Sequence, residues 1–465
     1  MRLDYSSKVV GLLLGFLFLL VTERTFAWED HTFLTHLLFS QDERFIQEPL
    51  IRAETLESFL EKEKHGLVAL LAAEEEWAKT YVQNYPARPA ELVFQSSCPS
   101  LSLKTCFLHA LRVNPHLKLN LFLQVLPGDS VVKRPLLPMH EVTLLSQPFK
   151  SADEIFIQLR EGESVKALDV LASASDEPDY GIDVGLWEDN QTEFGKNYRF
   201  GKQPFGNPVL EYSGQAPFHM GFFHESEWAY RVAGYLSRTY PEYRVHLFKT
   251  LSLFAFEKGH PYWGYRFAGW ALHYVQDLTQ PYHSTAVPGV SFLKTVFLGF
   301  LDLLGIHAPL RNQVQLLTNE HLALENFQYF AFHDALKSRD LNRPYVRALF
   351  SGTHLPSHEL NQDFDLRARV SLDSFLRARL THQELRSALP ERYIQDPHYI
   401  FGTTEKEVNL WRDLKEKGLG QDLEKMNHLL GELMEGTGIY SRAFIHSILE
   451  KSKSQLKSKS KSKSR

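Results

Sequence analysis

The sequence predicts a mainly α-helical fold. Apolar residues recur at three- and four-residue spacing from residue 28 to about 90, with few helix-breaking residues between them. Two further helical regions are expected, from about 225 to 283 and from about 310 to 450. The chain has 465 residues, of which 43% are apolar, so it is long enough to bury a large core.

The first 27 residues are typical of an export signal. Arg2 and Lys8 precede an unbroken apolar run at residues 9–21, which is short for a membrane span but typical of a signal peptide. A small-residue cleavage pattern follows and ends at Ala27. We therefore predict a mature chain that begins at Trp28 and is secreted or periplasmic. An uncleaved membrane anchor is the alternative.

The region between the expected helical segments is mixed. Residues 91–160 contain several prolines and short apolar runs, such as LNLFLQVL, that fit either a strand or a helix. Residues 165–175 predict a helix, and residues 181–214 are rich in Gly, Asn and Pro and predict a long loop.

The charge is distributed unevenly along the chain. The net charge is −5, but the last 15 residues, Lys451 to Arg465, carry +7 and residues 1–27 carry +1. About −13 therefore remains on residues 28–450, which is poorly suited to holding a long polyanion. Bound divalent cations would offset part of this charge. The Lys/Ser alternation of the tail at 451–465 predicts disorder.

Cys98 and Cys106 are the only cysteines. Two cysteines exclude a zinc site built from four thiolates. In an exported protein this pair can close a small disulfide loop. Two unpaired, buried cysteines are the alternative.

Two His-x-x-x-acid patterns provide candidate metal ligands. His273 and Asp277 are four residues apart, so on a helix they share one face. Pro281 is expected to end that helix and to leave His283 on the turn beyond it. His321 and Glu325 repeat the spacing. Imidazole and carboxylate together suit zinc, although an isolated pattern of this kind also arises as a surface helix contact.

Together these motifs resemble the zinc-dependent phospholipase C family and the related fungal single-strand-specific zinc nucleases. The shared pattern is an N-terminal Trp, a nearby His, an Asp, a His, then His-x3-Asp-x5-His and a final His-x3-acid. Glu325, followed by Asn326 and Phe327, resembles the phospholipase branch, since the nucleases use Asp. The resemblance implies a helical fold with a trinuclear zinc site.

The resemblance also implies nine ligands for up to three zinc ions. These are Asp176, His219, His273 and Asp277 for the first ion; His283, His321 and Glu325 for the second; and Trp28 and His31, with Asp277 shared, for the third. Residue 28 would bind through its carbonyl oxygen and its α-amino group, whose ordinary pKa of about 8 lets zinc displace the proton. Signal cleavage would then create a ligand.

Three of these assignments have alternatives within the chain. His36 competes with His31 in the first expected helix, and His224 competes with His219 in an aromatic-rich segment. Asp176, favoured because it follows a helix that ends in small residues, competes with Asp179 and Asp183. We expect the favoured aspartate to orient or deprotonate the attacking water as well as to bind metal.

Longer spacings than in compact family members indicate one domain over residues 28–450, with insertions at about 43–165 and 284–315. The second insertion contains an apolar stretch at residues 289–306, in which Lys294 and Asp302 are the only charged residues. One interpretation is a helix buried in the core against the first insertion. The other is a segment that contacts a membrane beside the metal site.

The expected activity is zinc-dependent hydrolysis of phosphate esters, with phospholipids as the favoured substrate. A single-strand-specific nuclease of the same fold is the alternative, and the acidic body makes nucleic acid the less favoured partner. A non-catalytic envelope protein stabilised by zinc is the third hypothesis. Membrane contact is expected through residues 289–306 and through the basic tail.

Overall fold

The computed structural model of the protein places most of residues 28–465. The predicted export signal, residues 1–27, lies outside the described residues. Among the described residues, no helix combines the length and the hydropathy that crossing a bilayer requires. The structure describes residues 28, 30–131, 133–145, 154–206, 208, 211–351, 365–401, 404–405, 408–417 and 419–463.

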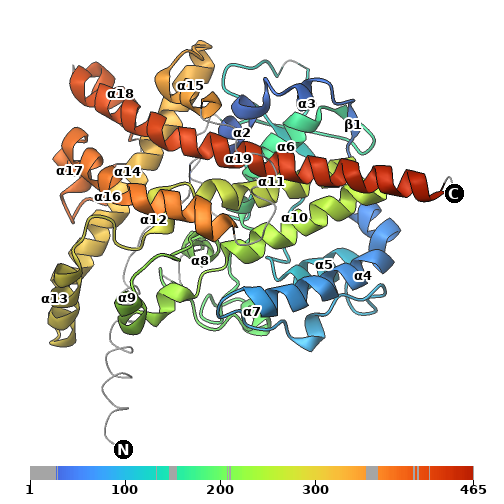
Figure 1. The fold of residues 1–465 in the computed structure, drawn as a ribbon, viewed down its shortest axis with the longest axis horizontal. Helices are drawn as coiled ribbons and strands as arrows, with labels where there is room; N and C mark the ends of the chain where they lie inside the picture. The colour runs from blue at the N-terminus through green and yellow to red at the C-terminus, as the bar shows by residue number, and fades with distance from the viewer. Residues whose placement is uncertain are drawn as a thin grey trace, which may run out of the picture.

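The fold is mainly α-helical, as predicted (Figure 1). Short 3-10 turns (η) link several helices in the first half of the chain. The helical elements up to residue 237 are α2 (His31–Phe39), α3 (Glu43–Ile46), α4 (Leu56–Tyr81), η1 (Ala90–Leu92), α5 (Leu103–Leu111), η2 (Met139–Glu141), α6 (Ala167–Ser175), η3 (Glu177–Tyr180), α7 (Glu193–Tyr198), η4 (Tyr212–Gln215), α8 (Ala216–His219), α9 (Glu227–Val232) and η5 (Gly234–Ser237).

The second half contains the longest helices. Its elements are α10 (Pro241–Lys258), α11 (Pro261–Asp277), α12 (Pro281–Ser284), α13 (Phe292–Leu303), α14 (Ala308–Ser338), α15 (Pro344–Phe350), the π-helical turn η7 (Leu366–Ser371), α16 (Leu372–Ala388), α17 (Glu391–Ile394), α18 (Leu410–Glu416) and α19 (Gly420–Lys463).

All strands among the described residues lie within the predicted insertion at 43–165. They form two small antiparallel sheets, one with the order β1-β5 and one with the order β2-β4-β3. The segment LNLFLQVL, for which the sequence fitted a strand or a helix, contains a strand. The strands are β1 (Ile51–Arg52), β2 (Phe122–Gln124), β3 (Leu136–Leu137), β4 (Phe156–Gln158) and β5 (Ser164–Val165).

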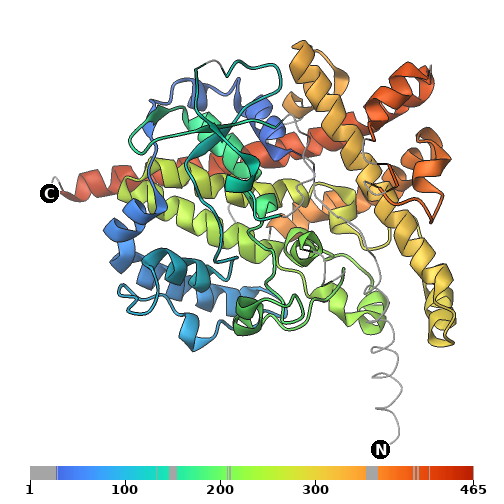
Figure 2. The same ribbon diagram turned by 180° about the vertical axis from the view of Figure 1, so that it is seen from behind.

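Helix α11 lies at the centre of the molecule. Every residue of α11 after Pro261 is buried, and α11 packs against α10, α6 and α19 (Figures 1 and 2). Gly269 permits the close approach of α6, because a Cβ atom at this position would lie 2.6 Å from Cβ of Ala174 and 2.7 Å from the carbonyl oxygen of Leu171. The end of α6 therefore sits directly against the face of α11 that carries the candidate ligands.

Proline starts a new helix just beyond α11. Helix α11 ends at Asp277, and Pro281 occupies the first turn of α12, where its missing N–H group costs no hydrogen bond. The side chain of Gln280 accepts a hydrogen bond from the amide of Tyr282 and caps this helix. His283 therefore lies within α12 and not on a turn as expected. The predicted loop at 181–214 also contains a helix, α7.

The Lys/Ser-rich tail is helical where the sequence predicted disorder. Helix α19 continues through it to Lys463, and its end projects beyond the body (Figure 1). Met426 and Leu430, in the earlier part of α19, are fully buried, so the helix is nucleated by packing. Adding residues to an existing helix is easy, and lysine is a good helix former.

Cys98 and Cys106 form a disulfide, with their Cα atoms 6.5 Å apart. Cys106 belongs to α5, whose Phe107 and Leu108 are fully buried. The bond therefore attaches the loop before α5 to a helix that is fixed in the core.

Candidate metal centre

Two ligands that the sequence predicted lie one turn apart at the end of α11. His273 and Asp277 are fully buried, and Nε2 of His273 lies 3.3 Å from Oδ2 of Asp277. Nδ1 of His273 is 2.8 Å from the carbonyl oxygen of Ser175 at the end of α6. Because a carbonyl oxygen only accepts, Nδ1 carries a hydrogen, and Nε2 is the nitrogen that faces Asp277.

His219, the last residue of α8, faces the same carboxylate oxygen. Its Nδ1 atom lies 2.9 Å from Oδ2 of Asp277 and 3.0 Å from Nε2 of His273. Two imidazole nitrogens and a carboxylate oxygen therefore converge at one point. Such an arrangement requires a proton or a cation between the groups.

His31, the first residue of α2, faces the other oxygen of Asp277. Its Nε2 atom lies 3.3 Å from Oδ1 of Asp277, and its Nδ1 atom is 2.7 Å from Oε1 of Gln276. The amide nitrogen of Gln276 donates to the hydroxyl groups of Thr35 and Ser441, which fixes Oε1 toward His31. Nδ1 of His31 is therefore the donor to Gln276, and its Nε2 atom is the one directed at Asp277.

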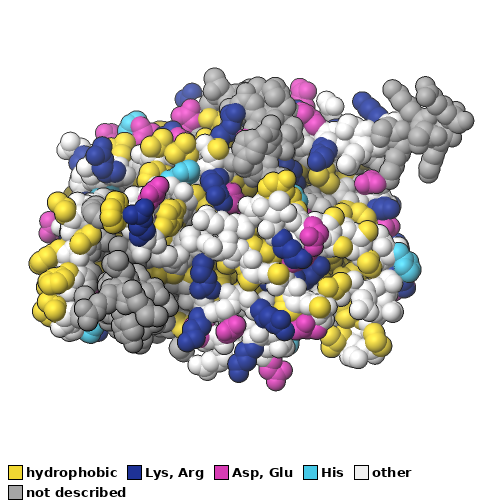
Figure 3. All heavy atoms as spheres, turned by 60° about the horizontal axis from the view of Figure 1, so that its bottom comes forward, with side chains coloured by type: hydrophobic (Ala, Val, Ile, Leu, Met, Phe, Trp, Pro, Cys, Tyr) yellow, Lys and Arg dark blue, Asp and Glu magenta, His cyan; other side chains and the backbone are white. Residues whose placement is uncertain are grey.

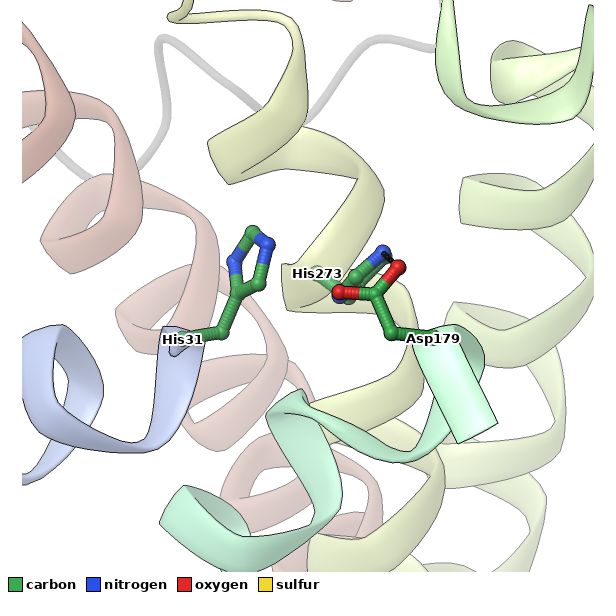
Figure 4. Close-up of side chains that lie close together, drawn as sticks. All are labelled: His31, Asp179 and His273. Carbon is green, nitrogen blue, oxygen red and sulfur yellow. Dashed lines mark ion pairs between the residues drawn. The ribbon is translucent and has the colours of Figure 1, made fainter. Parts of the chain in front are cut away.

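A second carboxylate reaches this point from η3. Oδ1 of Asp179 lies 3.6 Å from Nε2 of His273 and 3.8 Å from Nδ1 of His219. Figure 4 shows the carboxylate of Asp179 and the ring of His31 near His273. Single donor atoms of these three residues lie within 4.8 Å of one another. We call His31, Asp179, His219, His273 and Asp277 the first cluster.

Asp176, the favoured aspartate of the sequence analysis, contacts the backbone at the start of α2. Its Oδ1 atom accepts a hydrogen bond of 2.6 Å from the main-chain N–H of His31. Since Asp30, which precedes α2, makes no side-chain cap, Asp176 caps this helix from another element. The structure thus brings Asp179, the alternative, to the imidazoles, whereas Oδ1 of Asp176 holds the first amide of α2.

His283, His321 and Glu325 form a second cluster between α12 and α14, and donor atoms of all three lie within 4.8 Å of one another. Oε1 of Glu325 lies 2.7 Å from Nε2 of His321 and 4.0 Å from Nε2 of His283. Nδ1 of His283 donates to the carbonyl oxygen of His219 at 3.1 Å, which links the two clusters through one residue.

The two competing histidines lie elsewhere. His36 faces Asp169 at 3.7 Å and is partly exposed. His224 donates from Nε2 to the carbonyl oxygen of Arg367 at 2.9 Å. Of the alternatives left open by the sequence, the structure therefore brings His31 and His219 to the clusters.

Trp28 is fully buried beside the end of α11. Its indole nitrogen donates to Oγ1 of Thr279 at 2.9 Å, and that hydroxyl group donates to the carbonyl oxygen of Gln276 at 2.6 Å. The side chain therefore anchors residue 28 next to Asp277. Coordination by its α-amino group depends on cleavage after Ala27 and stays a prediction.

Asp183 lies behind His219 and was predicted only as an alternative ligand. Its Oδ2 atom is 3.5 Å from Nε2 of His219 and accepts a hydrogen bond of 2.6 Å from the hydroxyl group of Tyr274. Nε of Arg244 donates to Oδ1 at 2.8 Å. Burial favours the neutral acid, but the guanidinium group of Arg244 outweighs it and lowers the pKa of Asp183. A buried anion therefore supports His219 from outside the cluster.

Several buried polar atoms of the first cluster lack a hydrogen-bond partner among the described residues. Within the described part of the chain, both oxygens of Asp277 and the Nε2 atoms of His31 and His219 are buried without a hydrogen bond of good geometry. Burial alone lowers the pKa of His219, but Asp183 and Asp277 together raise it to about 10. Burial raises the pKa of Asp277, but the neighbouring imidazoles bring it well below its usual range. A bound cation would satisfy these atoms, so the residues fit one.

The donor set suits a first-row divalent metal ion. Neutral imidazole and carboxylate ligands are typical of zinc, and the ring nitrogens that donate to carbonyl and amide oxygens are typical of metal-binding histidines. No family model matches the sequence, no curated protein matches the chain and no solved structure matches the fold.

Proposed function

We propose that this protein is a zinc-dependent phosphoric ester hydrolase of the phospholipase C type that acts on phospholipids. One observation carries the proposal: the two oxygens of Asp277 face different imidazoles, Oδ1 facing His31 and Oδ2 facing His219 and His273. A carboxylate in this position suits bridging two metal ions. The second cluster lies beside it, so a centre of up to three ions can be assigned.

The first cluster and the second cluster divide the ligands between the ions. One ion would be held by Asp179, His219, His273 and Oδ2 of Asp277, and one by the second cluster. A third would take Oδ1 of Asp277, His31 and the α-amino group of residue 28. This assignment follows the resemblance described above except that Asp179 takes the place of Asp176.

When bound, such ions lower the pKa of a bound water and offset the charge on phosphate oxygens. The chain itself supplies fixed ligand orientations, because His273, His31 and His283 each donate from Nδ1 to an oxygen of a packed element. Asp179, whose carboxylate lies 3.6 Å from Nε2 of His273 and 3.8 Å from Nδ1 of His219, would take over the expected role of orienting the attacking water. The described residues at both clusters are almost fully buried, which strengthens every charge interaction there.

Charge favours a lipid ester over a nucleic-acid strand. The body carries about −13 over residues 28–450, which opposes a long polyanion. The Asn-Phe pair that resembles the phospholipase branch has a structural use here. Asn326 bonds to the backbone of Val408 and Leu410 before α18, and Phe327 is fully buried. The preference for phospholipid therefore depends on charge more than on this pair.

The proposal is tested with purified mature protein supplied with zinc. We expect about two to three zinc ions per chain by elemental analysis. Activity on phosphatidylcholine or a chromogenic phosphocholine ester should exceed activity on single-stranded DNA at physiological salt. Less than one zinc per chain contradicts the metal centre, and the opposite ranking favours the nuclease. Full zinc content without hydrolysis of either substrate favours a non-catalytic envelope protein stabilised by zinc.

Export and processing belong to the same proposal. N-terminal sequencing of the secreted or periplasmic protein should begin at Trp28. A chain that begins elsewhere would remove residue 28 from the ligand set, because its amide nitrogen would no longer be a free amine.

A further inference from the structure

Helix α13 has an apolar face that is open to solvent. Within the helix its residues recur at three- and four-residue spacing, so they form one stripe, and two further apolar residues follow just beyond the C-terminal end of the helix. Their exposed fractions range from 46% to 79%, and Figure 3 shows hydrophobic side chains gathered at this end of the molecule. The apolar face of α13 consists of Leu293, Val296, Phe297, Phe300, Leu304 and Ile306.

The opposite side of α13 already attaches the helix to the body. Leu298 is 7% exposed and forms a small buried cluster with Leu310 and Val314 of α14. The expectation of a core helix packed against the insertion at 43–165 is therefore wrong, because the packing partner is α14. The exposed aromatic rings are not needed for this attachment.

The exposed charged residues in the segment that contains α13 are positive. Lys294, Asp302 and Arg311 are the only charged residues between 285 and 319. Lys294 and Arg311 are exposed, whereas Asp302 is buried and its carboxylate lies 2.6 Å from Nδ1 of His307. This local positive charge contrasts with the acidic body and complements anionic headgroups.

Helix α14 connects the apolar face of α13 to the candidate metal centre. Leu310 and Val314, which bind α13, lie in the first turns of α14, and His321 follows about 10 Å further along the axis at about 1.5 Å per residue. One continuous helix therefore carries two residues of the second cluster and the residues that pack against Leu298 of α13.

We propose that the apolar face of α13 docks on the surface of a bilayer that contains anionic phospholipid. With twelve residues, α13 is about 18 Å long, which is too short for a hydrocarbon core of about 30 Å but suits a helix lying in the interface. Lys294 and Arg311 then face the headgroups while Phe297 and Phe300 enter the acyl boundary. The inference deepens the proposed function, since it brings the second cluster to the layer that holds phosphate esters.

The basic tail does not belong to this surface. The C-terminal end of α19 and helix α13 lie at opposite ends of the long axis of the molecule (Figures 1 and 2). The two segments that the sequence paired as membrane contacts are therefore separate, and we assign docking to α13.

The test compares wild-type mature protein with the double variant Phe297→Ser/Phe300→Ser. Binding is measured by sedimentation with vesicles of phosphatidylcholine with and without phosphatidylglycerol, in the cold and with lipid integrity checked afterwards. We expect the variant to bind the anionic vesicles about 100-fold more weakly, because two large apolar side chains no longer leave water. Its zinc content, melting temperature and turnover of a soluble phosphocholine ester should match the wild type, since both rings are more than half exposed.

Matched controls separate docking from folding and from self-association. Ile46→Ser/Leu50→Ser removes two equally exposed apolar residues far from α13 and should leave vesicle binding unchanged. Leu298→Ser should lower the melting temperature, because that residue is buried. Equal vesicle binding by wild type and the phenylalanine variant overturns the proposal. The proposal is also overturned if the wild type is a dimer, the phenylalanine variant is a monomer and both bind vesicles equally. In that case the apolar face of α13 is an interface between two copies of the chain.

The two proposals fail separately. A wild-type protein that binds vesicles through Phe297 and Phe300 but hydrolyses no phosphate ester would retain the docking surface and lose the proposed function. A protein that hydrolyses the soluble ester but does not bind vesicles would retain the proposed function and lose the docking surface.

Discussion

The two clusters differ in how far apart along the chain their members lie. In the second cluster, His321 and Glu325 share one face of α14, so helix formation alone brings them together. In the first cluster, His219 and His273 are 54 residues apart, and the contact of His31 with Gln276 joins residues 245 apart. The second cluster therefore depends on local helix register, whereas the first depends on the packing of α2, α6 and α8 against α11.

The clusters also differ in charge. The first contains two carboxylates, Asp179 and Asp277, and is supported by a third, Asp183. The second contains Glu325 alone. Because negative charge attracts a divalent cation, we expect the first cluster to bind metal more tightly than the second. We also expect removal of a carboxylate ligand to reduce metal affinity more at the first cluster.

Replacing Asp277 should have the largest effect. Asp277→Asn leaves a side chain of the same shape without the charge that faces His31, His219 and His273. We expect zinc to be lost from the first cluster and ester hydrolysis to fall by more than about 100-fold, because even outer partners of metal ligands cost 10–100-fold. Elemental analysis checks the metal. Asp169→Asn, at the partly exposed contact with His36, serves as the control and should keep full zinc content.

Replacing Glu325 should affect the second cluster alone. Glu325→Gln removes the only carboxylate of that cluster but keeps an oxygen for the hydrogen bond from Gln280. The expected result is about one zinc fewer per chain, with the first cluster still loaded. Loss of all zinc would show that the two clusters do not bind metal independently, and it would contradict their treatment as two separate sites.

Asp176 and Asp179, which lie just before and within η3, should affect different properties: Asp179 zinc binding and Asp176 stability. Asp179→Asn is expected to weaken zinc binding, since its carboxylate faces two imidazoles. Asp176→Ala is expected to keep zinc but to lower the free energy of unfolding by about 1–2 kcal/mol, the usual cost of a lost helix cap. Zinc titration and chemical denaturation measure the two effects. The opposite pattern would restore Asp176 as the ligand.

Asp183 tests the support behind His219. Asp183→Asn should weaken zinc binding by about 10–100-fold and also lower the melting temperature, because Arg244 loses its buried partner. Glu177→Gln is a matched control, since Glu177 forms a similar buried pair with Arg266. The control should lose stability but keep zinc affinity. If both variants bind zinc like the wild type, Asp183 has only a structural role.

The smallest effect expected is a proton count. His219 has a pKa of about 10 in the cation-free cluster, so it is protonated at neutral pH. A metal ion needs the neutral imidazole, and binding should therefore release about one proton from this residue. Calorimetry of zinc binding in buffers with different ionisation enthalpies measures the release. Binding enthalpies that do not depend on the buffer would contradict a protonated His219.

Sequence spacing predicted the residues whose partners lie on the same helix. His273 with Asp277 and His321 with Glu325 follow from helix periodicity, and both pairs are in contact. The choice between Asp176 and Asp179 could not follow from spacing, because a 3-10 turn between them sends one carboxylate to an amide of α2 and the other to the imidazoles.

Other features have no signature in the sequence at all. The oxygen that orients His273 is the main-chain carbonyl of Ser175, and any residue type supplies such a group. The outward face of α13 was also undecidable, since an apolar stretch gives no sign of which side finds a partner. Only Leu298 and its contacts with α14 settled which side is buried.

The buried hydrogen bond from Trp28 to Thr279 joins residues 251 apart. Contacts between such distant residues form slowly, because a long loop must close before any energy is gained. In a chain made from its N-terminus, α2 is completed about half a chain length before α11, the helix on which it docks. During most of synthesis, therefore, the side chains of Phe33, Leu34 and Leu37 in α2 remain exposed to solvent, although they are buried in the folded protein. The first cluster accordingly cannot assemble until α11 has been made.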